Sequence, residues 1–255
     1  MMNYPVLEHP GPKAFAHRGG ASEAPENTLP AFQHAADLGY VYLETDVHLT
    51  ADGVLMAFHD DQLDRTTDAV GAIADLPYSE LASVRVDGRE PIPRFADLLE
   101  AFPHARFNVD PKADDSVEPL AALLLARRDV NRVCIGAFSD ERITRMQTLC
   151  GPELCTSSGP KAFSRFLARS KGGMPPRNAP HPVFQVPLAH KGIRIVTPRL
   201  VRNAHRAGAE VHVWTIDEPA VMHELLDMGV DGVMTDKPIL LKSVLQERGE
   251  WFGTD

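Results

Sequence analysis

Two carboxylates stand two residues apart, Glu44 and Asp46, in the stretch 42–47, which reads as a β-strand. Side chains two residues apart on a strand share a face, so both acids point the same way. If that face is buried, the two charges repel and lose hydration unless a cation lies between them. Oxygen ligands of this kind suit Mg²⁺ or Ca²⁺. The pair therefore predicts a divalent-metal site, and the alternative is a solvent-facing strand whose acids serve only solubility.

A third candidate ligand is Asp110, which ends another apolar stretch. Asn108, Asp110 and Lys112 alternate onto one face of that strand. Asp110 can complete a metal shell, and the ammonium of Lys112 supplies a positive charge for an anionic substrate. An Asp before a Pro is more often part of a turn. The interpretation of Asp110 therefore depends on the carboxylate pair.

Two histidines, His17 and His59, each follow an apolar run and are the predicted acid and base. Imidazole titrates near neutral pH, so two histidines can hold opposite protonation states. Arg18 offers a planar fork suited to phosphate or carboxylate, and the glycines after it let backbone approach a ligand closely. Any one of the eleven histidines is more often a surface or core residue. We assign to that reading the four in helix-like contexts: His34, His104, His205 and His223.

Two further features lie near these residues. Residues 25–28 are explained as a helix N-terminus, and they follow His17 by one loop, which puts them beside the predicted site. Trp214 ends another apolar run. It is predicted to be either barrel core or a wall of the substrate pocket, and the sequence does not decide between them.

The elements that must position these residues alternate along the chain. The expected strands are residues 13–17, 42–47, 54–58, 106–110, 132–137, 154–156, 183–187, 193–196, 211–216 and 232–235. Helices between them have clear signals: Thr28 to Gly39, Thr197 to Gly208 and Asp217 to Gly229 each start with a cap residue and an early Pro and end at Gly. Strand, helix and strand in repetition predict parallel strands with crossover helices.

Either a closed (β/α)8 barrel or an open doubly wound sheet fits this alternation. No glycine-rich nucleotide-binding sequence follows any strand. The polar residues collect where several strands end, which is how a barrel builds its active face. The sequence therefore predicts an α/β fold, a TIM barrel, as a single domain over residues 1–255. Residues 171–182, rich in Gly, Pro and Arg, are expected to form a long loop on one face.

Composition narrows the class of protein. The chain has 255 residues, 44% apolar and 24% charged, which excludes disorder, collagen and coiled coil. A net charge of −9 argues against nucleic acid or an anionic membrane as the main partner. Residues 1–13 resemble neither a signal peptide nor an anchor, and no apolar run is long enough to cross a bilayer. Three sparse cysteines are expected to be reduced thiols, so the predicted location is cytoplasmic.

Together these strings resemble the glycerophosphodiester phosphodiesterase family. The resemblance spans about residues 13–240, and its motifs in this order are highly specific. They are His17-Arg18-Gly19, Pro25-Glu26-Asn27-Thr28, Glu44-Thr45-Asp46-Val47, His59-Asp60, Asn108-Val109-Asp110-Pro111-Lys112, Val213-Trp214-Thr215 and Asp231-Gly232-Val233-Met234-Thr235-Asp236-Lys237-Pro238.

The resemblance implies a TIM barrel that hydrolyses glycerophosphodiesters to an alcohol and glycerol 3-phosphate with a divalent cation. It implies Glu44, Asp46 and Asp110 as metal ligands, His17 and His59 as the acid–base pair, and Arg18 and Lys112 as phosphate-binding residues. The family commonly has Glu where this chain has Asp110, which is one methylene shorter, so a water could intervene between carboxylate and metal. The insertion after the second strand, from Asp60 to about Pro93, is short, which predicts a pocket open to varied head groups.

Other functions on the same barrel are hydrolysis of lysophospholipids or another phosphodiester, and non-enzymatic ligand binding. The second is disfavoured because none of His17, His59, Glu44 and Asp46 is missing. The expected partner is a small phosphodiester, in lipid and glycerol metabolism. The sequence leaves open the choice between Mg²⁺ and Ca²⁺, the oligomeric state, and whether the attacking group is water or the substrate's own glycerol hydroxyl.

Overall fold

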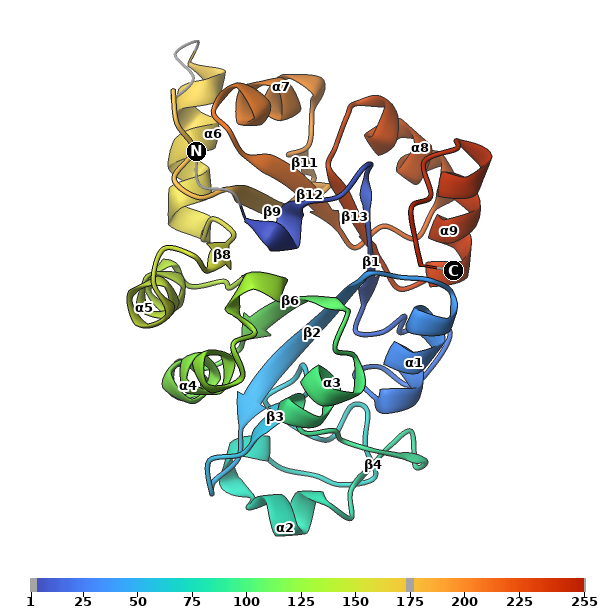
Figure 1. Cartoon of the computed structure of the whole chain (residues 1–255), viewed down its shortest axis with the longest axis vertical. Coiled ribbons are helices and arrows are strands. Elements are labelled where there is room, and N and C mark those ends of the chain that lie inside the picture. The colour runs from blue at the N-terminus through green and yellow to red at the C-terminus, as the bar shows by residue number, and fades with distance from the viewer. Residues whose placement is uncertain (1–3, 173–176, 255) are drawn as a thin grey trace.

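Eight parallel strands form a nearly closed barrel with helices outside it, in a computed structural model that describes residues 4–172 and 177–254 (Figure 1). The predicted TIM barrel is confirmed. A single bridge, Ser157 to Val183, joins the two ends of the sheet. Around the barrel the strands are β1 (Lys13–His17), β2 (Tyr42–Leu49), β6 (Arg106–Pro111), β7 (Val133–Ile135), β8 (Cys155–Thr156), β9 (Val183–Pro187), β12 (Glu210–Trp214) and β13 (Gly232–Thr235).

The outer helices begin where the sequence signals predict. Thr28 and Thr197 accept hydrogen bonds from the backbone N–H groups of Ala31 and Leu200, so both act as N-caps. Asp217 does not cap; its Oδ1 accepts from Thr235 and Asp236 instead. The helices are α1 (Leu29–Asp37), α3 (Phe95–Ala101), α4 (Val117–Arg127), α5 (Asp140–Cys150), α6 (Pro160–Lys171), α7 (Pro198–Arg206), α8 (Pro219–Asp227) and α9 (Pro238–Glu247), with 3₁₀ turns at Pro5–Leu7, Ile73–Asp75, Asp114–Ser116 and Val130–Arg132.

The alternation along β2 separates core from site. Leu43 and Val47 are fully buried in the largest apolar cluster, which the sheet forms with the outer helices. Burying a side chain of this size contributes about 1.5–3 kcal/mol. Glu44 and Asp46 therefore point the other way, into the barrel. Because Leu43 and Val47 pack against the outer helices, Glu44 and Asp46 lie inside the barrel, where they are buried.

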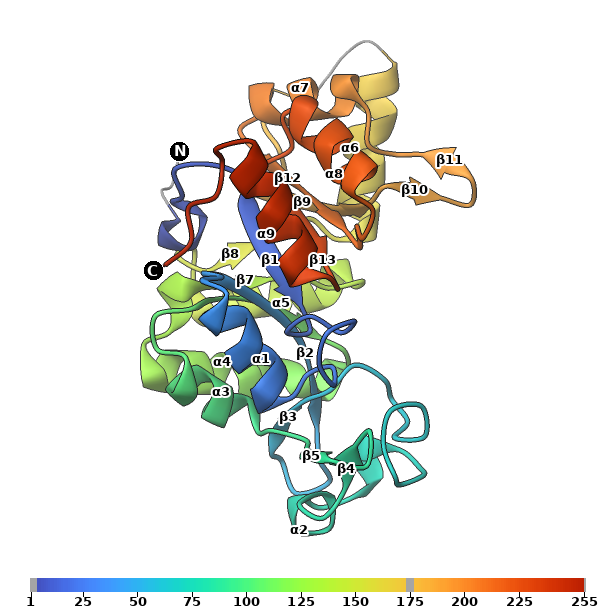
Figure 2. The same ribbon diagram turned by 90° about the vertical axis from the view of Figure 1, so that its right-hand side faces the viewer.

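The predicted strand over 54–58 is present but is not part of the parallel set. β3 (Leu55–Ala57) runs antiparallel to the end of β2. The insertion that follows forms a lobe at one end of the molecule, with α2 (Tyr78–Leu81), β4 (Arg85–Val86) and β5 (Glu90–Pro91) (Figures 1 and 2). It has its own apolar cluster, which includes Met56, Leu63 and Ile73. This lobe carries residues of the site described below.

The predicted strand over 193–196 does not belong to the barrel. β11 (Ile193–Arg194) pairs antiparallel with β10 (Ala189–His190) in a hairpin that projects from the body (Figure 2). Lys191 and Gly192 have positive φ angles of 49° and 78°, which suit a two-residue hairpin turn. The strand prediction is therefore confirmed for residues 193–194, but the strand pairs within this hairpin and not in the parallel sheet. In the expected loop over 171–182, residues 173–176 lie outside the described residues.

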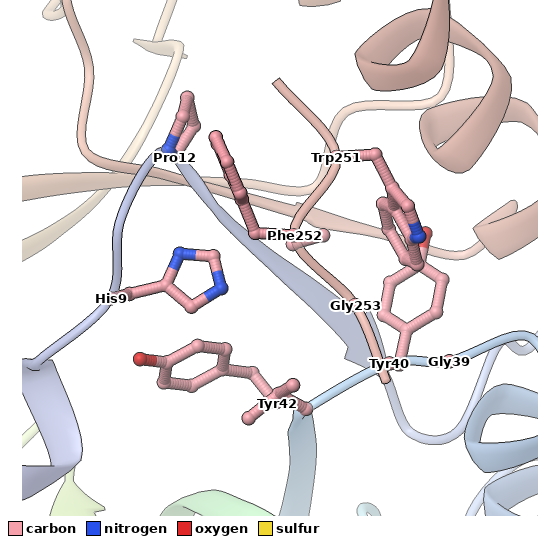
Figure 3. A pocket seen from close by; sticks show the side chains of 10 residues that line it. His9, Pro12, Gly39, Tyr40, Tyr42, Trp251, Phe252 and Gly253 are labelled. Atoms are coloured by element: carbon pink, nitrogen blue, oxygen red, sulfur yellow. The ribbon is translucent and has the colours of Figure 1, made fainter. Parts of the chain in front are cut away.

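Aromatic rings lie at the end of the barrel where its strands begin (Figure 3). The ring of Tyr40 meets that of Trp251 at 5.1 Å, and His9 meets Tyr42 at 5.4 Å. The cavity between them, about 10 Å³, has room for about one water molecule. This cavity between the rings is therefore too small for a substrate. Among the described residues, no helix is long and apolar enough to span a membrane.

Candidate active site

The three predicted acids lie together on two neighbouring strands. Glu44 and Asp46 are buried on β2, and Asp110 is buried on β6 directly beside Asp46 in the sheet register. Burial, and then the nearby charge of Asp46, raise the pKa of Glu44 to about 7. Burial also raises the pKa of Asp110. The barrel thus brings three carboxyl groups so close together that they are not all easily kept ionised.

Lys112 neutralises part of this charge. Its Nζ lies 2.7 Å from Asp46 Oδ1 and 3.0 Å from Asp110 Oδ2. Burial lowers the pKa of Lys112, but Asp46 and Asp110 outweigh that effect and raise it above its usual value. Burial works to raise the pKa of Asp46, yet Lys112, followed by Arg18 and His59, holds it below its usual value. Lys112 and Asp46 therefore form a charged pair.

Arg18 lies on the other side of Asp46. Its backbone N–H donates to Glu44 Oε2 at 3.1 Å, and its Nε is 3.5 Å from Asp46 Oδ2. Its Nη1 donates to Glu26 Oε1 at 3.0 Å. Asn27 also donates to Asp46 Oδ2, at 3.3 Å. The loop after β1 therefore brings Arg18 and Asn27 to the carboxylates of β2 and Glu26 to Arg18, as the position of residues 25–28 predicts.

Each predicted histidine is held at Nδ1 by an aspartate. His17 donates to Asp236 Oδ1 at 2.6 Å, and His59 donates to Asp60 Oδ1 at 2.5 Å. With Nδ1 protonated and held, Nε2 is the nitrogen left for proton transfer. Nε2 of His17 lies 3.8 Å from Glu44 Oε2. Burial would lower the pKa of His17, but Glu44 and Asp236 raise it above its usual value.

Arg65 and Glu26 extend this network; the sequence places Glu26 beside the site, but nothing in it indicates Arg65. Arg65, from the insertion lobe, donates to both carboxylate oxygens of Asp60 and to both of Glu26. Glu26 in turn accepts from Arg18. One guanidinium therefore links the partner of His59 to the partner of Arg18. Arg65 and Glu26 are 39 residues apart, and no local spacing signals such a contact.

We expect Arg65→Ala to lower turnover about tenfold or more, because it frees both Asp60 and Glu26 and so loosens His59 and Arg18, and small misplacements of catalytic groups are costly. Arg65→Lys should not restore the rate, since an ammonium cannot make two bidentate contacts. Steady-state kinetics measure the effect. The matched control is Arg94→Ala, which removes a similarly exposed guanidinium that pairs with Asp97. Equal rates for the Arg65 and Arg94 variants would contradict the prediction.

Trp214 ends β12 and is half-buried. Its ring meets the exposed ring of Phe138 edge-on at 5.7 Å, and it packs on the small apolar cluster around Phe15. Trp214 thus has a core-facing side and a side toward the end of the barrel where the strands terminate.

Inside the barrel, Gln185 donates to Asn108 Oδ1 at 2.6 Å.

The acids fit a divalent cation in their chemistry. Among the described residues, no three His, Cys, Asp or Glu side chains converge closely enough to hold a metal ion, and Lys112 lies between Asp46 and Asp110. Yet Oδ1 of Asp110 is buried without a hydrogen-bond partner, and Glu44 has a pKa near 7 beside a second carboxylate. Three carboxylates on adjacent strands are a donor set suited to Mg²⁺ or Ca²⁺.

A parallel barrel with acids, two Asp-held histidines, an arginine and a lysine at the carboxyl ends of its strands defines a TIM-barrel enzyme. Residues 17–240 match the glycerophosphoryl diester phosphodiesterase family, and the chain belongs to that family. It is therefore a phosphoric diester hydrolase by class, as its motifs predict.

Named relatives align with nearly the whole length of this chain. A Mycobacterium tuberculosis protein named probable glycerophosphodiester phosphodiesterase 2 is 40% identical over 97% of this chain and 96% of its own length. A lysophospholipase D of Rattus norvegicus is 27% identical over 96% of this chain and 91% of its own. The structure of an Oleispira antarctica phosphodiesterase with its product sn-glycerol 3-phosphate superposes with a TM-score of 0.77 at 24% identity, covering 92% of this chain and 97% of that one.

Proposed function

We propose that this protein hydrolyses glycerophosphodiesters to an alcohol and glycerol 3-phosphate, with a divalent cation and with His17 and His59 as the acid–base pair. One observation carries the proposal. Two histidines, each held at Nδ1 by an aspartate, flank the carboxylates of β2, one beside Glu44 and the other near Asp46. This arrangement suits a reaction that needs one proton removed and another delivered.

In this proposal Glu44, Asp46 and Asp110 hold the cation, which would neutralise the phosphodiester and stabilise charge on its oxygens. Arg18 and Lys112 supply fixed positive charge for the phosphate, and Trp214 lines the substrate pocket. Arg18 and Lys112 are both paired with Asp46 in the structure. The phosphate would therefore compete for Arg18 and Lys112 with carboxylates that the metal takes over.

The histidines share the proton transfers. One Nε2 removes the proton of the attacking hydroxyl, and the other Nε2 protonates the departing alkoxide of the alcohol. The P–O bond to the attacking oxygen forms as the P–O bond to the alcohol breaks. Asp236 and Asp60 keep each ring oriented. Whether water or the glycerol hydroxyl attacks is decided by looking for a cyclic phosphate among early products.

The test is glycerol 3-phosphate release from glycerophosphocholine and glycerophosphoethanolamine with Mg²⁺, with Ca²⁺ and with EDTA. We expect release that depends on one of the cations and stops with EDTA, because the acids repel each other without one. A heat-inactivated sample is the control. Release that is unchanged in EDTA would remove the cation from the mechanism, and no release from either substrate would contradict the proposed substrate class.

A second candidate substrate is a lysophospholipid. It is favoured by similarity to named lysophospholipases D, 27% identical to this chain. A higher rate on lysophosphatidylcholine than on glycerophosphocholine would favour it over the first.

We also propose that the enzyme works in the cytoplasm as a single domain in lipid and glycerol metabolism, and the free state of all three cysteines is consistent with that location.

A further inference from the structure

Charge is distributed very unevenly along this chain. Residues 154–209 contain ten Lys and Arg and no Asp or Glu. The other residues contain the remaining 16 of the 26 Lys and Arg and all 35 Asp and Glu. The net charge of −9 is therefore the sum of two unlike parts, +10 in residues 154–209 and −19 in the other residues. The net charge alone conceals a strongly basic segment, which attracts anionic partners.

The basic segment forms one end of the molecule. It contains β8, α6, β9, the β10–β11 hairpin and α7. Figures 1 and 2 both place α6 and α7 side by side at the end of the long axis opposite the insertion lobe. That lobe, residues 60–93, has eight Asp and Glu and three Lys and Arg. The protein therefore has a basic end and an acidic end.

The cations at the basic end are exposed and arranged in rows. Lys161, Arg165 and Arg169 are four residues apart on α6, so they lie along one face of that helix. Arg202 and Arg206 have the same spacing on α7 and are also exposed. Within the part of the chain that the structure describes, no carboxylate forms an ion pair with any of these five. They are available to an external anion.

The hairpin adds an apolar group to this charge. Ile193 is 64% exposed, and its neighbours Lys191 and His190 are exposed as well. The hairpin follows directly from the carboxyl end of β9, the end at which the barrel carries its acids and histidines, and it stands clear of the body (Figure 2). An apolar tip beside cations suits the boundary between lipid headgroups and acyl chains.

We propose that α6, α7 and the β10–β11 hairpin form a docking surface for an anionic lipid bilayer, with Ile193 entering the headgroup region. Clustered Lys and Arg are drawn to anionic lipids, and a peripheral contact of this kind needs no membrane-spanning helix. Nucleic acid is the less suitable anion. The segment has no Tyr or Trp, and its phenylalanines, Phe163, Phe166 and Phe184, are buried, so it offers no ring on which bases could stack.

Co-sedimentation with vesicles tests the docking surface. We expect the protein to bind vesicles of equal parts phosphatidylcholine and phosphatidylglycerol, to bind pure phosphatidylcholine much less, and to dissociate at high salt. Each of Arg165→Glu and Arg202→Glu should weaken binding about fivefold or more, and Ile193→Ser should weaken it about severalfold. Binding is measured without substrate, so its result is independent of the proposed activity.

Matched controls come from the acidic end. Arg89→Glu reverses an exposed charge and Val70→Ser removes an exposed apolar side chain on the insertion lobe, and neither should change vesicle binding. Melting curves verify that each variant is folded. No preference for anionic vesicles, or equal losses in the control variants, would overturn the proposal. Tighter binding to duplex DNA than to anionic vesicles at the same salt would also overturn it and identify nucleic acid as the partner.

Discussion

Replacing His17 by alanine should reduce turnover of a glycerophosphodiester by about 10²–10⁴-fold, the usual contribution of a general acid or base. The Nε2 of His17 lies beside Glu44, and its Nδ1 is held by Asp236, so the ring is oriented for proton transfer. Its loss would remove the proposed proton-transferring group and leave the carboxylates in place. Metal affinity and melting temperature should therefore stay close to those of the parent. Steady-state rates, metal titration and melting curves measure the three quantities.

The matched control for this prediction is His34→Ala. His34 also pairs with a carboxylate, Glu23, at 2.8 Å, but it lies on the outer helix α1. It should retain the parental rate, while His59→Ala should lose activity as His17→Ala does. A fully active His17→Ala enzyme would remove His17 from the mechanism. A large fall in melting temperature would instead indicate that the ring is mainly structural.

The barrel and the grouping of its acids follow from patterns that are local in sequence. The alternation of strands and capped helices predicts parallel strands, and parallel strands bring their carboxyl ends to one face. For that reason the sequence predicts that Asp110 joins Glu44 and Asp46 at one site, although the insertion lobe separates β2 from β6 along the chain. The side-chain period of a strand then predicts that both acids of β2 share one face, and the packing of Leu43 and Val47 against the outer helices shows that this face is the barrel interior.

Contacts between distant loops could not be predicted in the same way. Asp236 holds His17 across 219 residues, and Arg65 reaches Glu26 across 39. Such pairs depend on the path of each loop, which no periodicity encodes. The apolar pattern of a strand also does not reveal its direction or the strand with which it pairs. The apolar run at Ile193 has a strand pattern, but the turn at Lys191 and Gly192 pairs it with a neighbour outside the barrel.

Lys112→Met should destabilise the protein strongly when no divalent cation is present. Lys112 is the cation between Asp46 and Asp110, and removing one partner of a buried ion pair typically costs about 3–5 kcal/mol. For a domain of this size that loss corresponds to a fall in melting temperature of roughly 10 °C. Activity should fall as well, since the phosphate loses a fixed positive charge. Thermal melting in EDTA measures the first effect.

The same variant also tests whether the acids bind a metal. If Glu44, Asp46 and Asp110 are the ligands, Mg²⁺ or Ca²⁺ replaces the lost ammonium charge, and binding to the folded state raises the melting temperature by mass action. The rise should be larger for Lys112→Met than for the parent, where Lys112 competes with the cation. The control is Lys242→Met, because the ammonium of Lys242 donates to the backbone carbonyl of Leu38. An unchanged melting temperature of Lys112→Met in EDTA would show that the acids are stable without Lys112. A cation-dependent rise no larger than that of Lys242→Met would show that they do not hold the metal.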